Sequence, residues 1–249
     1  MIPEPIFKIE GAVQHYDWGG HHFIPSLMGI ANERQQPFAE SWYGGHSMHP
    51  SLLVDKQGRK WPLSELIKNN PVAYLGDSTE KQFPFLLKLL DVKNMLSIQA
   101  HPNKTQAQKG FSKENELHIP FNASNRNYKD ANHKPEMMVA LSDFWLLHGF
   151  KNESDLMATL RSHTELDEFV QHFQAGGYQQ LLHYLMNLPM VAVEDILKPI
   201  LPRLPRVDKN HYGYWMNNTS SSLRRHLPAR GHVTQLPLWT KYRADGQQR

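Results

Sequence analysis

Two polar side chains near the middle of the chain could together hold a cation. In the segment LSIQAH (residues 96–101), alternation places the apolar side chains on one face of a strand and Ser97, Gln99 and His101 on the other. That second face presents an amide oxygen and an imidazole two residues apart, pointing the same way. Taken alone, these residues also fit a half-exposed strand whose polar face is hydrogen-bonded and binds no metal.

A carboxylate comes from the segment NHKPE (residues 132–136), which begins a second predicted strand, over residues 132–141, with Lys134 and Glu136 on one face. With Gln99 and His101, Glu136 makes a set of three N and O ligands of the kind that a catalytic zinc uses, with a position left for water or substrate. One carboxylate leaves such a site net positive, which suits polarising a carbonyl or stabilising an enediolate. Lys88 and Lys134 would add charge for an anionic substrate; the alternative is that both lysines form ordinary ion pairs.

Composition limits the class of protein and the kind of metal site. The chain has 249 residues, 40% of them hydrophobic and 20% charged, as in an ordinary soluble globular protein. The absence of cysteine excludes disulfides and thiolate metal sites, whereas 15 histidines are available as ligands. The first residues do not read as a signal peptide, and the apolar run at 83–90 is too short to span a membrane. We therefore expect a cytoplasmic protein that does not bind membranes.

The positive charge is confined to one end of the chain. Residues 222–249 carry six basic residues and one acidic residue, while the rest of the chain carries more acidic than basic residues. A basic surface that covers the whole protein is therefore excluded, and we expect no nucleic-acid partner.

The elements that must position the polar residues fall into two classes. Strands are predicted over residues 6–18, 39–44 and 143–150, with Gly19-Gly20 allowing a close backbone approach after the first. A short helix is predicted over residues 62–70. Residues 104–131 read as polar and turn-rich, with one short helix from a Ser112 cap to Leu117. From Ser154 the apolar period changes to that of helices, predicted near 154–160, 166–173, 181–185 and 191–201.

Several of these segments resemble the type I phosphomannose isomerases. The matching stretches, all collinear, are YDWG (16–19), AESWYG (39–44), PFLLKLLD (84–91), LSIQAHPNK (96–104) and YKDANHKPE (128–136). The resemblance implies a mainly β fold: a cupin-type jelly roll with a helical insertion. It also implies an enzyme that interconverts mannose 6-phosphate and fructose 6-phosphate by proton transfer between C1 and C2 through an enediol. The partner would then be a small sugar phosphate, and the cofactor one Zn²⁺ per chain.

The resemblance also implies roles for individual residues. Gln99, His101 and Glu136 match three of the family's four zinc ligands. The matches to positions that line the family's pocket are Trp18, Glu40, Lys88, Ser97 and Lys134. For Trp42, a role as a core aromatic whose indole N–H finds a carbonyl is the preferred interpretation.

The chain departs from the family pattern toward its end. The family's fourth ligand, a histidine in a Pro-His-Ala-Tyr context, and its catalytic arginine have no match, and a second jelly roll is absent. The domains we predict are an incomplete jelly-roll catalytic domain (1–150), a helical insertion (151–217) and a divergent basic tail (218–249). We expect an N-terminal fragment whose tail arises from a frameshift or truncation; in the rival interpretation, His226 or His232 replaces the missing ligand.

Two consequences follow from an incomplete barrel. Exposed strand edges would allow self-association by edge pairing. The alternative function is a non-catalytic, cupin-like protein that binds a sugar phosphate or a metal, since the fourth ligand and the arginine are missing.

Overall fold

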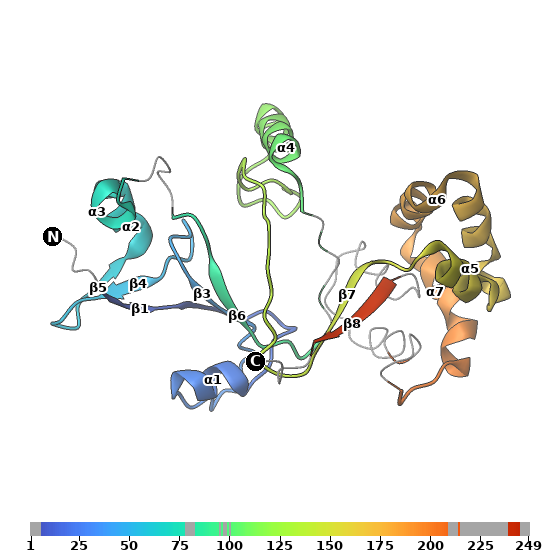
Figure 1. Cartoon of the computed structure of the whole chain (residues 1–249), viewed down its shortest axis with the longest axis horizontal. Helices are drawn as coiled ribbons and strands as arrows, with labels where there is room; N and C mark the ends of the chain where they lie inside the picture. Colours follow the sequence, from blue (N-terminus) through green and yellow to red (C-terminus); the bar gives the residue numbers. More distant parts are fainter. Residues whose placement is uncertain are drawn as a thin grey trace. The chain divides into compact units, whose positions relative to one another are not determined.

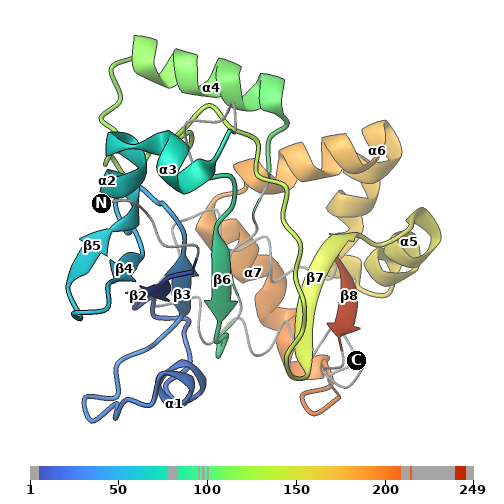
Figure 2. The same cartoon turned by 60° about the vertical axis from the view of Figure 1, so that its left-hand side comes forward.

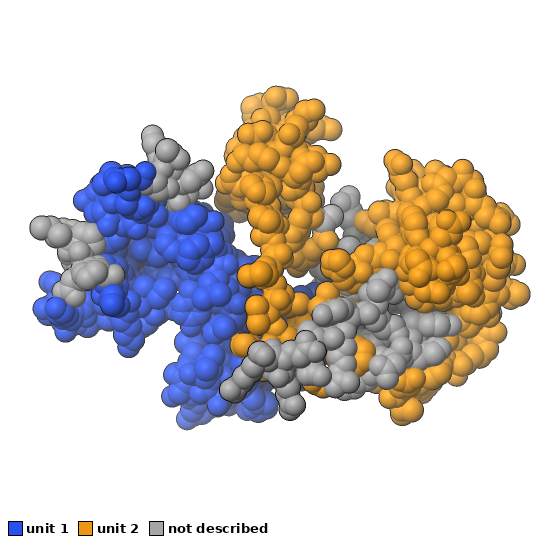
Figure 3. Space-filling model, viewed as in Figure 1, with its two compact units in different colours: residues 1–96 blue, residues 97–249 orange. Residues whose placement is uncertain are grey.

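The computed structural model describes residues 6–77, 83–94, 96, 99, 101–208, 214 and 239–244. The chain divides into two units, Met1–Leu96 and Ser97–Arg249, which are coloured separately in Figure 3. Each unit has its own sheets and helices and is described by itself. In the described part of the chain, no helix is both long and apolar enough to cross a membrane.

The first unit contains an antiparallel sheet in the order β2-β3-β6, of which Figure 1 labels β3 and β6. Its strands are β2 (Ala12–Gln14), β3 (Glu40–Tyr43) and β6 (Leu87–Leu90), so the strand predicted over 39–44 is confirmed. In the register of the sheet, Gln14 lies opposite Glu40, and Lys88 lies opposite Trp42. Residues that face each other across antiparallel strands share a face of the sheet, and so do alternate residues of one strand. Gln14, Glu40, Trp42 and Lys88 therefore lie on one face.

A second antiparallel sheet of the first unit has the order β1-β4-β5, formed by Lys8–Glu10, Leu52–Val54 and Lys60–Pro62. Helix α2 (Leu63–Asn69) confirms the helix predicted over 62–70, and it buries Leu63 and Ile67. Two further short helices are α1 (Phe23–Met28) and α3 (Pro71–Leu75).

The glycine pair after β2 permits the predicted close approach between backbones. A Cβ atom on Gly19 would lie 2.6 Å from the backbone nitrogen of Ala39, and one on Gly20 would collide with the carboxylate of Asp91. The Gly20 amide donates to the Asp91 carbonyl at 2.8 Å, and its carbonyl accepts from the Phe38 amide at 2.7 Å. Side chains larger than hydrogen at both positions would push β2 and its turn away from β3 and from the chain after β6.

The second unit begins with a helix that the sequence interpretation underestimated. Helix α4 (Lys104–Glu116) is much longer than the short helix predicted from Ser112 to Leu117, and its cap lies earlier in the chain. Asn103 caps it, and Gln106 closes a capping box by accepting from the Asn103 amide at 3.0 Å. Only Ala107 and Glu114 of this helix are buried, so it lacks the apolar stripe from which helical periodicity is recognised.

The long strand of the second unit is β7 (Phe144–Phe150), as predicted, and it pairs antiparallel with β8 (Trp239–Ala244) (Figure 2). No element was predicted within residues 218–249, so β8 is an addition to the prediction. The strand predicted over 132–141 is wrong, because these residues belong to no strand. Met137 and Val139 there are 92% and 72% exposed, so the alternation has no second layer to pack against.

Helices α5 (Glu153–Arg161), α6 (Asp167–Asn187) and α7 (Met190–Ile200) follow β7. They enclose one apolar cluster whose buried members run from Leu156 to Leu204. The cap of α5 is Asn152 rather than the predicted Ser154, and two predicted helices are halves of α6 that meet at a kink at Gly176 and Gly177. The predicted domain boundaries at 150 and 217 stay predictions.

Candidate functional site

A carboxylate, an ammonium group and an indole meet on the shared face of the β2-β3-β6 sheet. The Lys88 Nζ lies 3.6 Å from Oε2 of Glu40 and 4.8 Å from the centre of the Trp42 ring. The Trp42 indole N–H donates to that same carboxylate oxygen, instead of to the carbonyl that the sequence interpretation expected. Glu40 and Trp42 are buried, whereas the Lys88 side chain keeps 33% of its surface exposed. The arrangement offers a ligand a positive charge with free N–H donors beside a buried carboxylate.

Gln14 is a polar residue of this face that the sequence interpretation missed. It lies opposite Glu40 in the register, and only 6% of its surface is exposed. Its side-chain Nε2 is buried and, in the structure as described, has no hydrogen-bond partner. Alternation within three residues could not assign Gln14 to the face of Glu40; that assignment depends on the strand register.

Trp18 lies on the turn that follows β2. Its half-buried ring stacks on Tyr16 with a centroid separation of 5.7 Å. Its carbonyl accepts from the amides of Lys93 and Asn94, both at 3.0 Å, which fixes the turn beside the end of β6. Burial raises the pKa of the Tyr16 phenol, and the negative charge of Glu40 raises it further. Tyr16 therefore lies within the electrostatic influence of the carboxylate.

In the second unit, the structure brings together two of the three predicted metal ligands. The Nε2 atom of His101 lies 3.7 Å from Oε2 of Glu136, and the two side chains are 33% and 58% exposed. Gln99 is exposed and lies two residues before His101, while Ser97 lies outside the described residues. His101 and Glu136 come from opposite ends of the segment that contains α4.

The pair fits a zinc ion in both chemistry and spacing. Zinc bonds of about 2.0–2.2 Å to a histidine nitrogen and a carboxylate oxygen, at a tetrahedral angle, separate the two ligand atoms by about 3.4 Å. The observed 3.7 Å is close to this value. Across the described ranges, no cluster of three or more histidines and acidic residues could hold a metal ion. Such a cluster consists of histidines and acidic residues alone, whereas the third predicted ligand, Gln99, would bind through its side-chain amide.

Lys134 takes up an ion pair in this structure. Its Nζ lies 4.0 Å from Oδ2 of Asp130, four residues earlier in the chain, and 53% of the Lys134 side chain is exposed. A pair at this distance and exposure is weak and easily exchanged for another anion. Lys134 thus forms an ordinary ion pair, as one of the two interpretations predicted. Its ammonium group could still leave Asp130 and pair with a bound phosphate.

Comparison with known proteins identifies relatives. Residues 6–153 match the family model described as the phosphomannose isomerase type I catalytic domain. The mannose-6-phosphate isomerase of Salmonella typhimurium is 39% identical over 188 residues, which is 73% of this chain and 48% of the relative. The Escherichia coli enzyme of the same name is 36% identical over the same shares. The chain spans about half the length of the curated relatives it matches.

Solved structures of such enzymes resemble this one along nearly its whole length. A structure of the Salmonella typhimurium enzyme with fructose 6-phosphate and zinc has a TM-score of 0.77 at 31% identity, covering 96% of this chain and 61% of that one. A zinc-bound mannose 6-phosphate isomerase has a TM-score of 0.79 at 32% identity and the same coverage. Three structures of the Salmonella enzyme carry single substitutions of a lysine, a histidine and a glutamate.

Proposed function

Since this chain belongs to the type I phosphomannose isomerase family, we propose that it interconverts mannose 6-phosphate and fructose 6-phosphate with the aid of zinc. The observation that carries the proposal is the contact between His101 and Glu136, because it joins two ligand atoms of the right chemistry inside the matched segment. Lys88, His101 and Glu136 are also spaced in this chain as are the three residues substituted in the Salmonella variants. That equal spacing supports a role for each.

We assign the metal to His101, Glu136 and Gln99, one ion per chain. Zinc bound there would act as a Lewis acid toward the oxygens at C1 and C2 of the sugar. The three ligands contribute one negative charge, so a site that holds Zn²⁺ would remain net positive and would attract an anionic substrate. The fourth ligand has no assignment among the described residues, and His226 and His232, the alternative candidates, lie outside them.

The remaining assigned residues would bind and orient the sugar phosphate. Lys88 and Lys134 would offset the charge of the phosphate or of a developing oxyanion. Glu40 would accept a hydrogen bond from a sugar hydroxyl, since its partners, Lys88 and Trp42, both engage one of its two oxygens. Trp18 would present an apolar ring face to the sugar, and Ser97 would add a hydroxyl. The residue that moves the proton between C1 and C2 is unassigned.

The architecture that accompanies this function is a cupin-type jelly roll with a helical insertion. The sheets of residues 8–90 would belong to the jelly roll. Helices α5 to α7, with their own apolar cluster, would form the insertion over residues 151–217. Residues 218–249 would form a divergent basic tail, of which β8 pairs with β7.

The cellular location and the binding partners of the protein are part of the same proposal. We propose a cytoplasmic enzyme that takes a small sugar phosphate and binds no nucleic acid. Exposed strand edges would allow self-association. Light scattering over a range of protein concentrations tests this last point, and a constant monomer mass would contradict it.

A coupled assay tests the function. Purified protein supplemented with zinc is supplied with mannose 6-phosphate, and formation of fructose 6-phosphate is followed. The control is the double variant Gln99→Ala/His101→Ala, which removes two assigned ligands from an exposed segment. Turnover that is abolished in the double variant supports the proposal. A folded, zinc-supplemented chain without turnover contradicts it and favours the non-catalytic alternative.

A further inference from the structure

We propose that Glu114 and Arg126 are positioning residues that hold Glu136 within reach of His101. This inference rests on the proposed function only in naming zinc as the ligand; the positioning itself concerns the chain alone. Neither residue belongs to the predicted site. Glu114 lies on α4, Arg126 lies in the loop that connects α4 to the segment carrying Glu136, and both are buried.

The two candidate ligands lie at the two ends of a closed segment of chain. His101 precedes the α4 cap, Asn103, by two residues, and Glu136 follows Asn132 by four. The Nζ of Lys104, in the first turn of α4, donates to Oδ1 of Asn132 at 2.6 Å and closes the segment at its base. The distance between the ligands therefore depends on how the loop over residues 117–131 folds back against α4.

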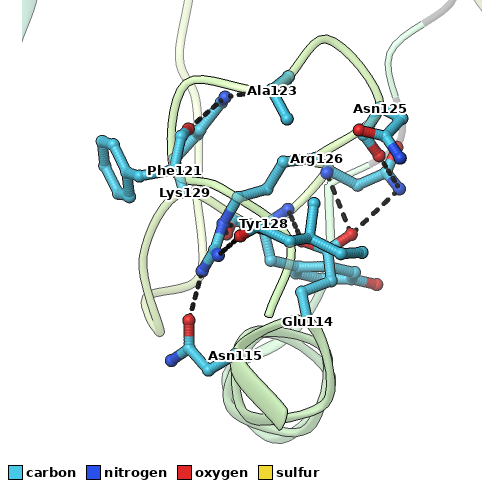
Figure 4. Close-up of polar contacts among 10 residues, drawn as sticks. Glu114, Asn115, Phe121, Ala123, Asn125, Arg126, Tyr128 and Lys129 are labelled. Atoms are coloured by element: carbon cyan, nitrogen blue, oxygen red, sulfur yellow. Dashed lines mark hydrogen bonds and ion pairs between the residues drawn. The ribbon is translucent and has the colours of Figure 1, made fainter. Parts of the chain in front are cut away.

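Arg126 fixes that loop against the helix (Figure 4). Its guanidinium group donates to the carbonyls of Tyr128 and Ile119, at 2.9 and 2.7 Å, and to Oδ1 of Asn115 on α4, at 2.6 Å. Its side chain is only 3% exposed and lies 5.2 and 5.6 Å from the rings of Phe111 and Phe121. One planar group thus joins the helix, the start of the loop and its end.

Glu114 accepts hydrogen bonds from the last part of the same loop. Its Oε1 accepts from the backbone amide of Asn127 at 3.0 Å and from the Asn127 side chain at 3.1 Å, and its Oε2 accepts from the Tyr128 amide at 2.8 Å. The Nε of Arg126 lies 3.9 Å from Oε2, so each buried charge has the other as its counter-ion. The Tyr128 ring also packs directly against Gly110, where an added Cβ would collide with it, so the end of the loop contacts α4 at this position as well.

The residues after Tyr128 connect this part of the loop to Glu136. The Asn132 amide donates to Oδ1 of Asp130 at 2.8 Å, and the Asn132 side chain accepts from Lys104. Three residues separate Asn132 from Glu136, and the last of them is Pro135, whose ring fixes its own φ. Residues 132–141 belong to no strand that could hold Glu136 by a ladder. Within the described structure, the Glu114–Arg126 pair is therefore the nearest buried polar contact that precedes this ligand along the chain.

The test measures zinc binding and backbone opening in the whole chain, without an activity assay. The first variant is Arg126→Met, which removes the N–H donors of the guanidinium group. The second is Glu114→Gln, which keeps the shape of the side chain and removes its charge. The matched control is Arg203→Met in the helical part, because Arg203 also pairs with a carboxylate, that of Glu165 at 2.5 Å, but has a side chain that is 53% exposed. Zinc affinity is measured by competition with a chromophoric chelator, and amide hydrogen exchange is followed in zinc-free protein over residues 127–137.

We expect zinc to bind about 10-fold more weakly or worse in both variants, as for residues that orient metal ligands in other proteins. We also expect faster exchange over residues 127–137, with the circular dichroism of the helices unchanged and the control behaving as wild type. Wild-type exchange in a folded variant would overturn the inference. If the wild-type chain binds no zinc, the metal site of the proposed function fails, and the exchange comparison still decides the positioning role. Should Arg126→Met not fold, Glu114→Gln decides.

Discussion

The ammonium group of Lys88 and the carboxylate of Glu40 lie 3.6 Å apart on adjacent strands of one sheet. Glu40 is 8% exposed, and this partner and the Trp42 indole N–H both contact its buried carboxylate. The lysine in turn lies over the Trp42 ring, which restricts its side chain. The sugar phosphate of the proposed function would therefore meet a lysine that is already ordered, at little further cost in side-chain entropy.

The first prediction concerns that lysine. Lys88→Met should lower kcat/KM for mannose 6-phosphate by about 100-fold or more, because it removes a preorganised positive charge from the proposed pocket. Steady-state kinetics measure the change. The matched control is Lys60→Met, since Lys60 pairs with Glu10 at 2.6 Å on the exposed side of the same unit. Equal kinetics for the two variants would contradict the assignment.

A second prediction concerns the unpaired amide of Gln14. Gln14→Met keeps the length of the side chain and removes the buried Nε2 donor, for which the described part of the chain offers no hydrogen-bond partner. We expect the free energy of unfolding to stay the same or to rise by about 1 kcal/mol, because no hydrogen bond of the side chain's buried donor is lost. Urea denaturation of this variant and of Gln57→Met, an exposed control, measures the difference. A marked loss of stability at Gln14 alone would mean that its amide has a partner in solution.

The acid sensitivity of the loop after α4 gives a third prediction. Burial by itself raises the pKa of Glu114, but the amides of Asn127 and Tyr128 and the charge of Arg126 outweigh it, and the net pKa is lowered. A carboxyl whose pKa is lower in the folded state stabilises the fold fully above its unfolded pKa of about 4.3. That contribution is lost as the pH falls through the folded value.

Thermal unfolding between pH 6 and pH 3 tests this sign. Wild-type protein should lose stability in the acid range more steeply than Glu114→Gln, because glutamine has no proton to gain. Glu116→Gln serves as the comparison, since Glu116 lies on the same helix and is exposed. Parallel curves for wild type and Glu114→Gln would show that the lowered pKa does not contribute to folding.

The kink in α6 supports a fourth prediction. Gly177 has φ of 62° and ψ of −153°, a backbone region essentially restricted to glycine. Gly177→Ala should therefore destabilise the helical part by about 1–3 kcal/mol. At Gly176, φ is −164°, which any residue adopts, so the added cost is limited to a contact of 2.8 Å between the new Cβ and the Cβ of Gln180. Gly176→Ala should cost less, and chemical denaturation of both variants compares neighbouring positions directly.

The sequence alone was sufficient for the family, the strand at 39–44, the helix at 62–70 and most of the helical segment after residue 150. These predictions held because they depend on local patterns: apolar periodicity, glycine pairs and collinear motifs. Periodicity failed where burial is sparse. Helix α4 buries only Ala107 and Glu114, and the alternation over 132–141 faces solvent instead of a second layer.

The tertiary structure decided which polar residues meet. The motifs named His101 and Glu136 as ligands, but their 3.7 Å separation depends on a loop folded against α4 by Glu114 and Arg126. Likewise, Gln14 joins the face of Glu40, and β8 joins β7, only through strand register. The physical reason is the same in each case. Spacing along the chain fixes the face a side chain takes within its own element, whereas contacts between distant segments are set by packing and hydrogen bonds that no local pattern encodes.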